Sequence, residues 1–365
     1  MVCRQSTCGG DLCWTQLPCS SPSQAPRLPP ELVRLICSFA CTDTGTTGRV
    51  LSLVSRYVRG ASAAVKLQSI ALVGYSQLSA FAEFLDNSPG VSPGTVSLYI
   101  TMQGLEVAKL TYSVRRRLAQ DGGRHLQKIF HRVSDTLEVL HLFLKDDLSY
   151  ELNQAARIDL PRLVELKTGG GFPVSVQRAG NIIQLTATLQ PSLKLTRLHI
   201  VESIGYYAVH FLDPKVLASF APNLISLRCS RLYVNPVLPI QVAQSMGFED
   251  SDLAAQELVL LDSWNAAHWH PETRLNMPKS VKDLVFQLQP LRPKPPPQSN
   301  ELYDIAIARQ HEEQVAEYAE MRDAVQRLAV RCKARDRDVR VVLLKPEPQE
   351  DLENPDVFLR EWLGI

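Results

Sequence analysis

Few side chains of this chain are spaced for metal or cofactor chemistry. Four cysteines lie within the first twenty residues: Cys3, Cys8, Cys13 and Cys19. Four or five residues separate each neighbouring pair, whereas zinc sites pair ligands about two to four residues apart around a tight turn. His268 and His270 would share one face of a strand, but by themselves they do not complete a set of metal ligands. The sequence therefore predicts no metal site and no cofactor.

Two glycine-rich segments lack the spacing that phosphate binding requires. Gly45-Thr46-Thr47-Gly48-Arg49 has no Gly-Lys-Ser/Thr ending, and we interpret it as a loop between two helices. Gly169-Gly170-Gly171 follows a predicted strand without a dinucleotide-binding pattern, which indicates a flexible turn. A Gly-x-Ser-x-Gly nucleophile elbow is also absent from the sequence. Nothing positive points to catalysis, so we expect a protein that is not an enzyme.

Basic residues recur at one position of a repeated pattern. Six segments share the frame apolar-x-x-apolar-x-residue, and they begin at Leu137, Leu163, Leu195, Leu224, Leu258 and Val281. Side chains alternate along a strand, so the residue just after the second apolar position points away from the core. Along the six segments this residue is His141, Lys167, His199, Arg228, Asp262 and Val285.

Four of these residues would form a basic row across neighbouring strands, about 4.8 Å apart. The row is therefore a candidate substrate site, consisting of His141, Lys167, His199 and Arg228. It would suit an acidic or phosphorylated peptide, with Arg228 making a two-pronged contact and the histidines binding more tightly as the pH falls. The alternative is a solvated strand face that binds no ligand.

The repeated frame also predicts the architecture. Its segments begin 23 to 34 residues apart, which leaves room for a strand, a turn, a helix and a return. The pattern resembles an irregular leucine-rich repeat, in which parallel strands line a concave face and helices cover the convex one. We therefore expect an α/β solenoid over residues 68–365. A non-repeat α/β domain with several parallel strands is the alternative.

Other patterns extend the alternation of strands and helices. Predicted strands cover 69–73, 96–100 and 339–344, and predicted helical faces cover 78–85, 126–133, 214–220 and 301–335. The final helix and strand predict one more parallel strand at the end of the array. Residues 290–297 are proline-rich and predict an extended loop, and Val357, Phe358 and Trp362 predict a capping helix.

Ahead of the array, the N-terminal residues predict two short helices. In the first, the apolar residues have the spacing i, i+3, i+4, i+7: Leu32, Leu35, Ile36 and Phe39. The second repeats this spacing with Val50, Leu53, Val54 and Tyr57. Two short helices cannot bury both stripes on each other, so one stripe must face a third element or another protein. Cys37 and Cys41 are expected to be buried, unreactive thiols.

Residues 27–67 resemble an F-box, in the form common among fungal proteins. The resemblance rests on Leu28-Pro29-Pro30-Glu31-Leu32, the apolar helix, the polar loop and Leu51-Ser52-Leu53-Val54-Ser55-Arg56. An F-box implies docking on the Skp-type linker of a cullin ubiquitin ligase, with the array holding a protein substrate. The contacts so implied are Leu28, Pro29, Glu31, Leu32, Leu35, Ile36, Leu53, Val54 and Val58.

Two alternatives to the ligase remain open. Val58 stands where the family usually has tryptophan, which favours an interaction scaffold that does not join a cullin complex. The helices could also form an ordinary hairpin packed on the core.

Composition limits the partners and the compartment. Lys and Arg total 39 against 38 Asp and Glu, so the net charge of +1 gives no argument for binding nucleic acid or a membrane surface. The sequence has neither an apolar run long enough for a membrane span nor the pattern of a signal peptide, and we expect the cytosol or the nucleus. Residues 1–26 have linker composition and are expected to be disordered.

Overall fold

In the computed structural model the described residues are 28–88, 93–102, 111–144, 158–179, 182–201, 214–232, 239, 242–243, 246, 248, 277–291, 301–334 and 338–346. Several predictions fall outside them: the tail 1–26 with its four cysteines, the segment that begins at Leu258, the His268-Trp269-His270 motif, most of the proline-rich segment, and the capping helix around Trp362.

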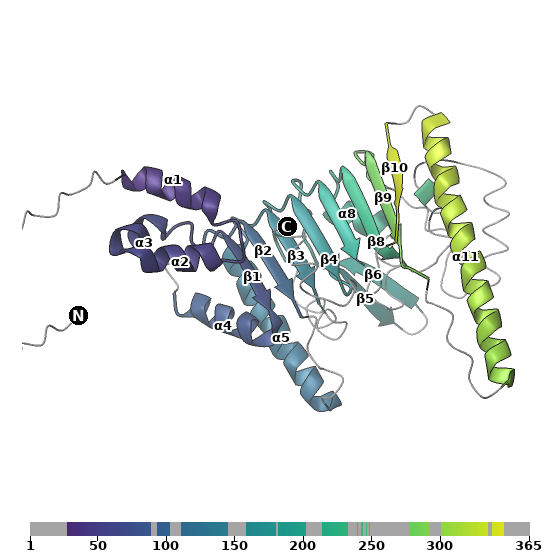
Figure 1. Cartoon of the computed structure of the whole chain (residues 1–365), viewed down its shortest axis with the longest axis horizontal. Coiled ribbons are helices and arrows are strands. Elements are labelled where there is room, and N and C mark those ends of the chain that lie inside the picture. The colour runs from purple at the N-terminus through teal and green to yellow at the C-terminus, as the bar shows by residue number, and fades with distance from the viewer. Residues whose placement is uncertain are drawn as a thin grey trace, which may run out of the picture.

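Eight strands of the described chain form one parallel sheet. They are β1 (Ser69–Val73), β2 (Ser97–Thr101), β3 (Val139–Phe143), β4 (Glu165–Gly169), β7 (Arg197–Val201), β8 (Ser226–Leu232), β9 (Asp283–Leu288) and β10 (Arg340–Leu344). Their order in space follows their order in the chain (Figure 1). Doubly wound sheets reverse this order partway, so the fold is a solenoid-like α/β array.

Helices pack on one face of the sheet. They are α4 (Gly74–Asp86), α5 (Tyr112–Val133), α8 (Pro214–Phe220) and α11 (Glu301–Ala334). Each helix contributes buried apolar side chains to one continuous core with the strands, for example Leu78, Leu126, Phe220 and Leu328. Connections of one hand place every helix on the same side when the strand order never reverses. Among the described residues, the opposite face carries a small cluster of buried apolar side chains: Tyr99, Phe143 and Val201.

The repeated frame is confirmed in five of its six segments. The second apolar position is fully buried in β3, β4, β7, β8 and β9, at Leu140, Leu166, Leu198, Leu227 and Leu284. The sixth segment, which begins at Leu258, lies outside the described residues. The frame predicted that Asp262 would lie between Arg228 and Val285 in the row. This prediction is wrong, because β8 pairs directly with β9 and aligns Arg228 with Val285.

A hairpin between β4 and β7 was not predicted. β5 (Val174–Ala179) and β6 (Ile182–Ala187) pair antiparallel and form a separate two-stranded sheet, where the frame predicted a helix. The expected turn after β4 is confirmed, since Gly170 and Gly171 have φ values of 82° and 102°, which favour glycine.

The C-terminal helix and strand follow the prediction with one correction. β10 pairs parallel to β9 as expected, and α11 packs against β10. Val325 and Leu328 of α11 are buried, as expected for its apolar face, and Met321 and Cys332 are buried with them, but Val315, which was expected on the same face, is 41% exposed.

Candidate functional site

The first candidate site is built on three short helices at the N-terminal end of the sheet, beside β1 (Figure 1). They are α1 (Pro30–Ala40), α2 (Thr46–Val54) and α3 (Arg56–Ser62). Proline at the start of α1 occupies a turn whose N–H groups have no partner within the helix. α1 and α2 both pack on α3. The hydroxyl of Tyr57 in α3 donates a hydrogen bond to the carbonyl of Leu28, which fixes the start of α1.

Two details of α2 and α3 correct the sequence analysis. The segment Thr46–Arg49 is the first turn of α2 and not a loop, because the Asp43 carboxylate accepts hydrogen bonds from the N–H groups of Gly45 (3.0 Å) and Thr47 (2.9 Å). The second predicted helix is also broken. Ser55 is extended, and its hydroxyl oxygen accepts a bond from the Val58 N–H (3.1 Å), so Tyr57 belongs to α3.

The large apolar side chains of α1 and α2 face solvent. They are Leu28, Leu32, Leu35, Ile36 and Phe39 with α1, and Val50, Leu53 and Val54 on α2, with exposed fractions from 47 to 74%. These eight are half of the sixteen exposed large apolar residues among those described. We call them the apolar surface. α1 turns its smaller side chain Cys37 inward, which is the reverse of an ordinary surface helix.

Of the predicted linker contacts, Leu28, Leu32, Leu35, Ile36, Leu53 and Val54 thus lie in the apolar surface. Pro29 and Glu31 are exposed beside them, and Val58 is half-buried. The structure therefore excludes the hairpin packed on the core. Sequence reasoning had not counted Phe39 and Val50 as contacts, although both belong to the same helical stripes.

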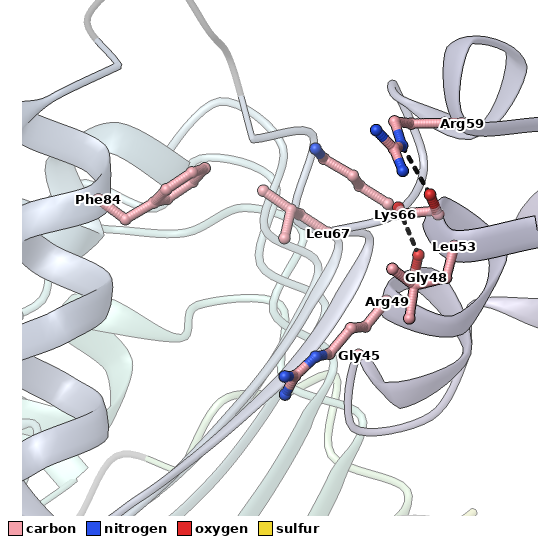
Figure 2. Close-up of a pocket in the computed structure, with 9 residues that line it drawn as sticks. Gly45, Gly48, Arg49, Leu53, Arg59, Lys66, Leu67 and Phe84 are labelled. Carbon is pink, nitrogen blue, oxygen red and sulfur yellow. Dashed lines mark hydrogen bonds between the residues drawn. The ribbon is translucent and has the colours of Figure 1, made fainter. Parts of the chain in front are cut away.

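A pocket of about 320 Å³ adjoins the apolar surface at Leu53 (Figure 2). Its charged lining residues are Arg49, Arg59 and Lys66, and Leu67 and Phe84 supply apolar walls. The Arg59 Nε donates to the Ser52 carbonyl (2.6 Å), which ties α3 to α2. Gly48 is buried beside Lys66. A Cβ at this position would overlap the Lys66 carbonyl oxygen, so no larger residue fits without a shift. The pocket thus offers positive charge next to exposed apolar side chains.

Cys37 and Cys41 are buried, as expected. Burial raises the pKa of the Cys41 thiol, and Cys37 and Asp43 raise this pKa further. A raised pKa keeps the thiol protonated and unreactive at neutral pH.

The second candidate site is the basic row. Strand pairing aligns His141 with Lys167, Lys167 with His199, and His199 with Arg228, which confirms the predicted alignment. All four lie on the face opposite the helices. However, His141 and Lys167 are only 7% and 3% exposed, so the expectation of a solvent-facing row is wrong for these two.

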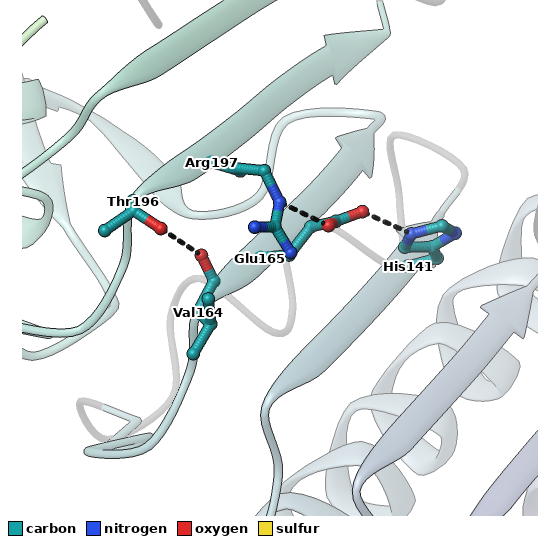
Figure 3. A network of polar contacts seen from close by, with 5 residues as sticks. All are labelled: His141, Val164, Glu165, Thr196 and Arg197. Carbon is teal, nitrogen blue, oxygen red and sulfur yellow. Dashed lines mark hydrogen bonds and ion pairs between the residues drawn. The ribbon is translucent and has the colours of Figure 1, made fainter. Parts of the chain in front are cut away.

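Glu165 organises one end of the row (Figure 3). Its carboxylate accepts a hydrogen bond from Arg197 Nε (2.7 Å) and lies 3.3 Å from His141 Nε2. The pKa of Glu165 is lowered to about 2. The hydrogen bond with His141 contributes most to this shift and Arg197 adds to it, whereas partial burial opposes it. Sequence reasoning missed Glu165 and Arg197, yet each lies two residues before a row residue and so shares its face.

The other end of the row is positively charged. Arg228 donates from Nε to the Ser230 hydroxyl (3.2 Å) and from its terminal nitrogen to Gln287 Oε1 (3.3 Å). Burial, followed by the charges of Lys167 and Arg228, lowers the pKa of His199 well below 6.5. His199 therefore stays neutral, and the predicted gain of affinity on acidification does not apply to it.

Comparison of the chain with models of protein families, with curated proteins and with solved structures gives no match. Within the described part of the chain, no helix combines the length and hydropathy of a membrane span.

Proposed function

We propose that this chain is the substrate-receptor subunit of a Skp-cullin-F-box ubiquitin ligase. In this proposal α1 to α3 dock on the Skp-type linker, the array holds a protein substrate, and catalysis belongs to partner subunits. The observation that carries the proposal is the apolar surface, whose eight side chains cluster on neighbouring helices instead of joining the core. Such clusters mark protein interaction sites on soluble proteins.

The cationic pocket supports a partner of defined chemistry. An amphipathic helix that covers Leu53 would bring its flanking residues to Arg49, Arg59 and Lys66. Acidic residues at those flanks would pair with the three cations. The proposed linker contact therefore combines an apolar helix face with carboxylates at its edge.

On the array, the proposed substrate is an acidic or phosphorylated segment of a protein. The support for this part is the aligned row, in which Lys167 on β4 and Arg228 on β8 lie on either side of His199 on β7. We expect the complex to act in the cytosol or the nucleus. The competing function is a scaffold that uses the same apolar surface for a different partner, which the half-buried Val58 in place of tryptophan favours.

Co-purification from cells tests the ligase assignment. We expect the Skp-type linker and a cullin to be recovered with the wild type and lost with Leu32→Asp/Leu35→Asp, because the two charges would have to be desolvated in the interface. The matched control is Leu193→Asp/Val330→Asp, which changes two side chains outside the apolar surface that are 68% exposed, more than Leu32 (47%) and Leu35 (51%). If another partner is lost instead and the linker is never recovered, the scaffold is the correct function.

A further inference from the structure

The pocket beside the apolar surface forms where α2 meets the segment that leads into β1. Two glycines of α2 and its preceding turn line it. Gly45 has a φ of 89°, which favours glycine, and a Cβ on Gly48 would overlap the backbone of Lys66. Close backbone contacts therefore fix the position of α2 against this segment, and with it the shape of the pocket.

Three cations line the pocket without a carboxylate partner in the described part of the chain. The side chains of Arg49 and Lys66 form no hydrogen bond or ion pair there, and the side chain of Arg59 bonds only to the Ser52 carbonyl. The Asp43 carboxylate is taken up by hydrogen bonds at the start of α2. A phosphate monoester carries a charge of about −1.5 to −2 at pH 7 and pairs with guanidinium groups through two parallel bonds. It would compensate more of this charge than a single carboxylate would.

The remaining wall of the pocket is apolar. The Lys66 side chain extends towards Leu67 and Phe84, which lie on this side of the pocket (Figure 2). Phe84 is 40% exposed, and its ring stacks on Phe81 of the same helix, with centroids 6.1 Å apart and an interplanar angle of 16°. An aromatic ligand can contact such a ring by offset stacking or edge to face. The pocket therefore combines a cationic part with an aromatic wall.

We propose that this pocket binds a phosphate monoester carried on an aromatic group. The phosphate pairs with Arg49, Arg59 and Lys66, and the aromatic ring contacts Leu67 and Phe84. The volume of about 320 Å³ lies at the lower end of the range of about 300 to 1,000 Å³ for small-molecule sites, which suits one such group. A phosphotyrosine side chain of a protein and a free aryl phosphate share this chemistry, so either can be the source.

An occupied pocket would change the charge next to Leu53. The phosphate would neutralise the cations that the acidic flanks of the linker are proposed to meet, so the ligand should weaken docking of the linker. This consequence rests on the proposed function, whereas ligand binding itself uses the pocket alone. A chain that binds an aryl phosphate but not the linker would retain this site and lose the ligase assignment.

Phosphorus and proton NMR of phenyl phosphate with the purified full-length chain tests the site. We expect saturable binding, which Arg49→Gln/Lys66→Gln weakens by about tenfold or more because charge-assisted hydrogen bonds are lost. Arg116→Gln/Arg117→Gln removes two exposed cations of α5 outside the pocket and should leave the affinity unchanged. Both variants should unfold at the wild-type urea concentration. Absence of binding by the wild type, or equal affinity of the wild type and Arg49→Gln/Lys66→Gln, overturns the proposal.

A further variant separates the aromatic contact from the charge. Phe84→Ala should weaken binding of phenyl phosphate about threefold to tenfold and leave binding of inorganic phosphate unchanged, because inorganic phosphate has no ring. An equal loss for both ligands contradicts the aromatic wall. A phosphotyrosine peptide that binds more tightly than phenyl phosphate assigns the source to a protein, and equal or weaker binding assigns it to a small aryl phosphate.

Discussion

On α2, Leu53 is 73% exposed, whereas on β4 Lys167 is 3% exposed. Each placement is unfavourable by itself, because water disfavours apolar surface and burial removes the hydration of a charge. The two regions differ in what holds their side chains in these unfavourable positions. The cations of the row lie on strands whose other face belongs to the core, so their positions are fixed by the fold. The apolar side chains of α1 and α2 have no such role, and we interpret them as a surface that a partner completes.

The largest expected contrast between the two regions is in stability. Leu140 lies fully buried in β3, and Leu140→Ala should lower the free energy of unfolding by about 2 to 5 kcal/mol through reduced burial and a cavity. Leu35→Ala removes the same atoms from an exposed position and should change it by less than about 0.5 kcal/mol. Urea unfolding of both variants measures the contrast. A comparable loss in both would mean that Leu35 packs on the core.

A smaller effect is expected within the row. The lowered pKa of Glu165 means that the folded state favours its ionised form, so its stabilising contribution is present above pH 4.5 and is lost as the pH falls towards 2. Glu165→Gln should therefore cost about 1 to 2 kcal/mol at neutral pH, and the cost should vanish near pH 2. Unfolding measured across this range tests the prediction.

Glu313→Gln is the control for that experiment, because its ion pair with Arg309 (3.1 Å) is exposed. This variant should change the stability by less than about 0.5 kcal/mol at every pH. A constant cost of Glu165→Gln from pH 7 to 2 would show that the carboxylate is not held in its charged form.

His199 gives the smallest effect. Its pKa is lowered in the folded state, so below pH 6.5 the unfolded chain takes up a proton that the folded chain does not. Stability should then fall by up to about 1 kcal/mol between pH 6.5 and 5.5, and His199→Asn should remove this part of the pH dependence. Proton NMR of the imidazole ring provides the direct check. A ring that titrates near pH 6.5 would contradict the neutral state.

The sequence predicted the strands better than their surroundings. Regular alternation around Leu140 and Leu166 identified the core face, and the shared frame correctly placed Lys167 beside His199 on the neighbouring strand. Burial of Lys167 was not predictable in this way, because alternation tells which face a side chain occupies and not how closely its neighbours enclose it.

Two of the local errors have local causes. At β5 and β6, two runs rich in β-branched residues flank Gly180-Asn181, which is itself a hairpin signal, but the longer repeat frame obscured it. At Ser55, periodicity alone suggested a continuous helix, and the capping preference of serine decided the outcome. The direction of the α1 stripe could not be read from spacing, since amphipathicity does not say which face meets the core.

Calorimetric titration of the purified chain with a purified Skp-type linker tests the central claim most directly. We predict binding with a negative heat-capacity change, as burial of apolar surface requires. Leu32→Asp/Leu35→Asp should weaken the affinity by about a hundredfold or more, since burial of each apolar side chain in the interface is worth about 1.5 to 3 kcal/mol. The same variant should unfold at the wild-type urea concentration. No binding by the wild type, or equal affinity of the two proteins, would contradict the assignment of the apolar surface to a ligase linker.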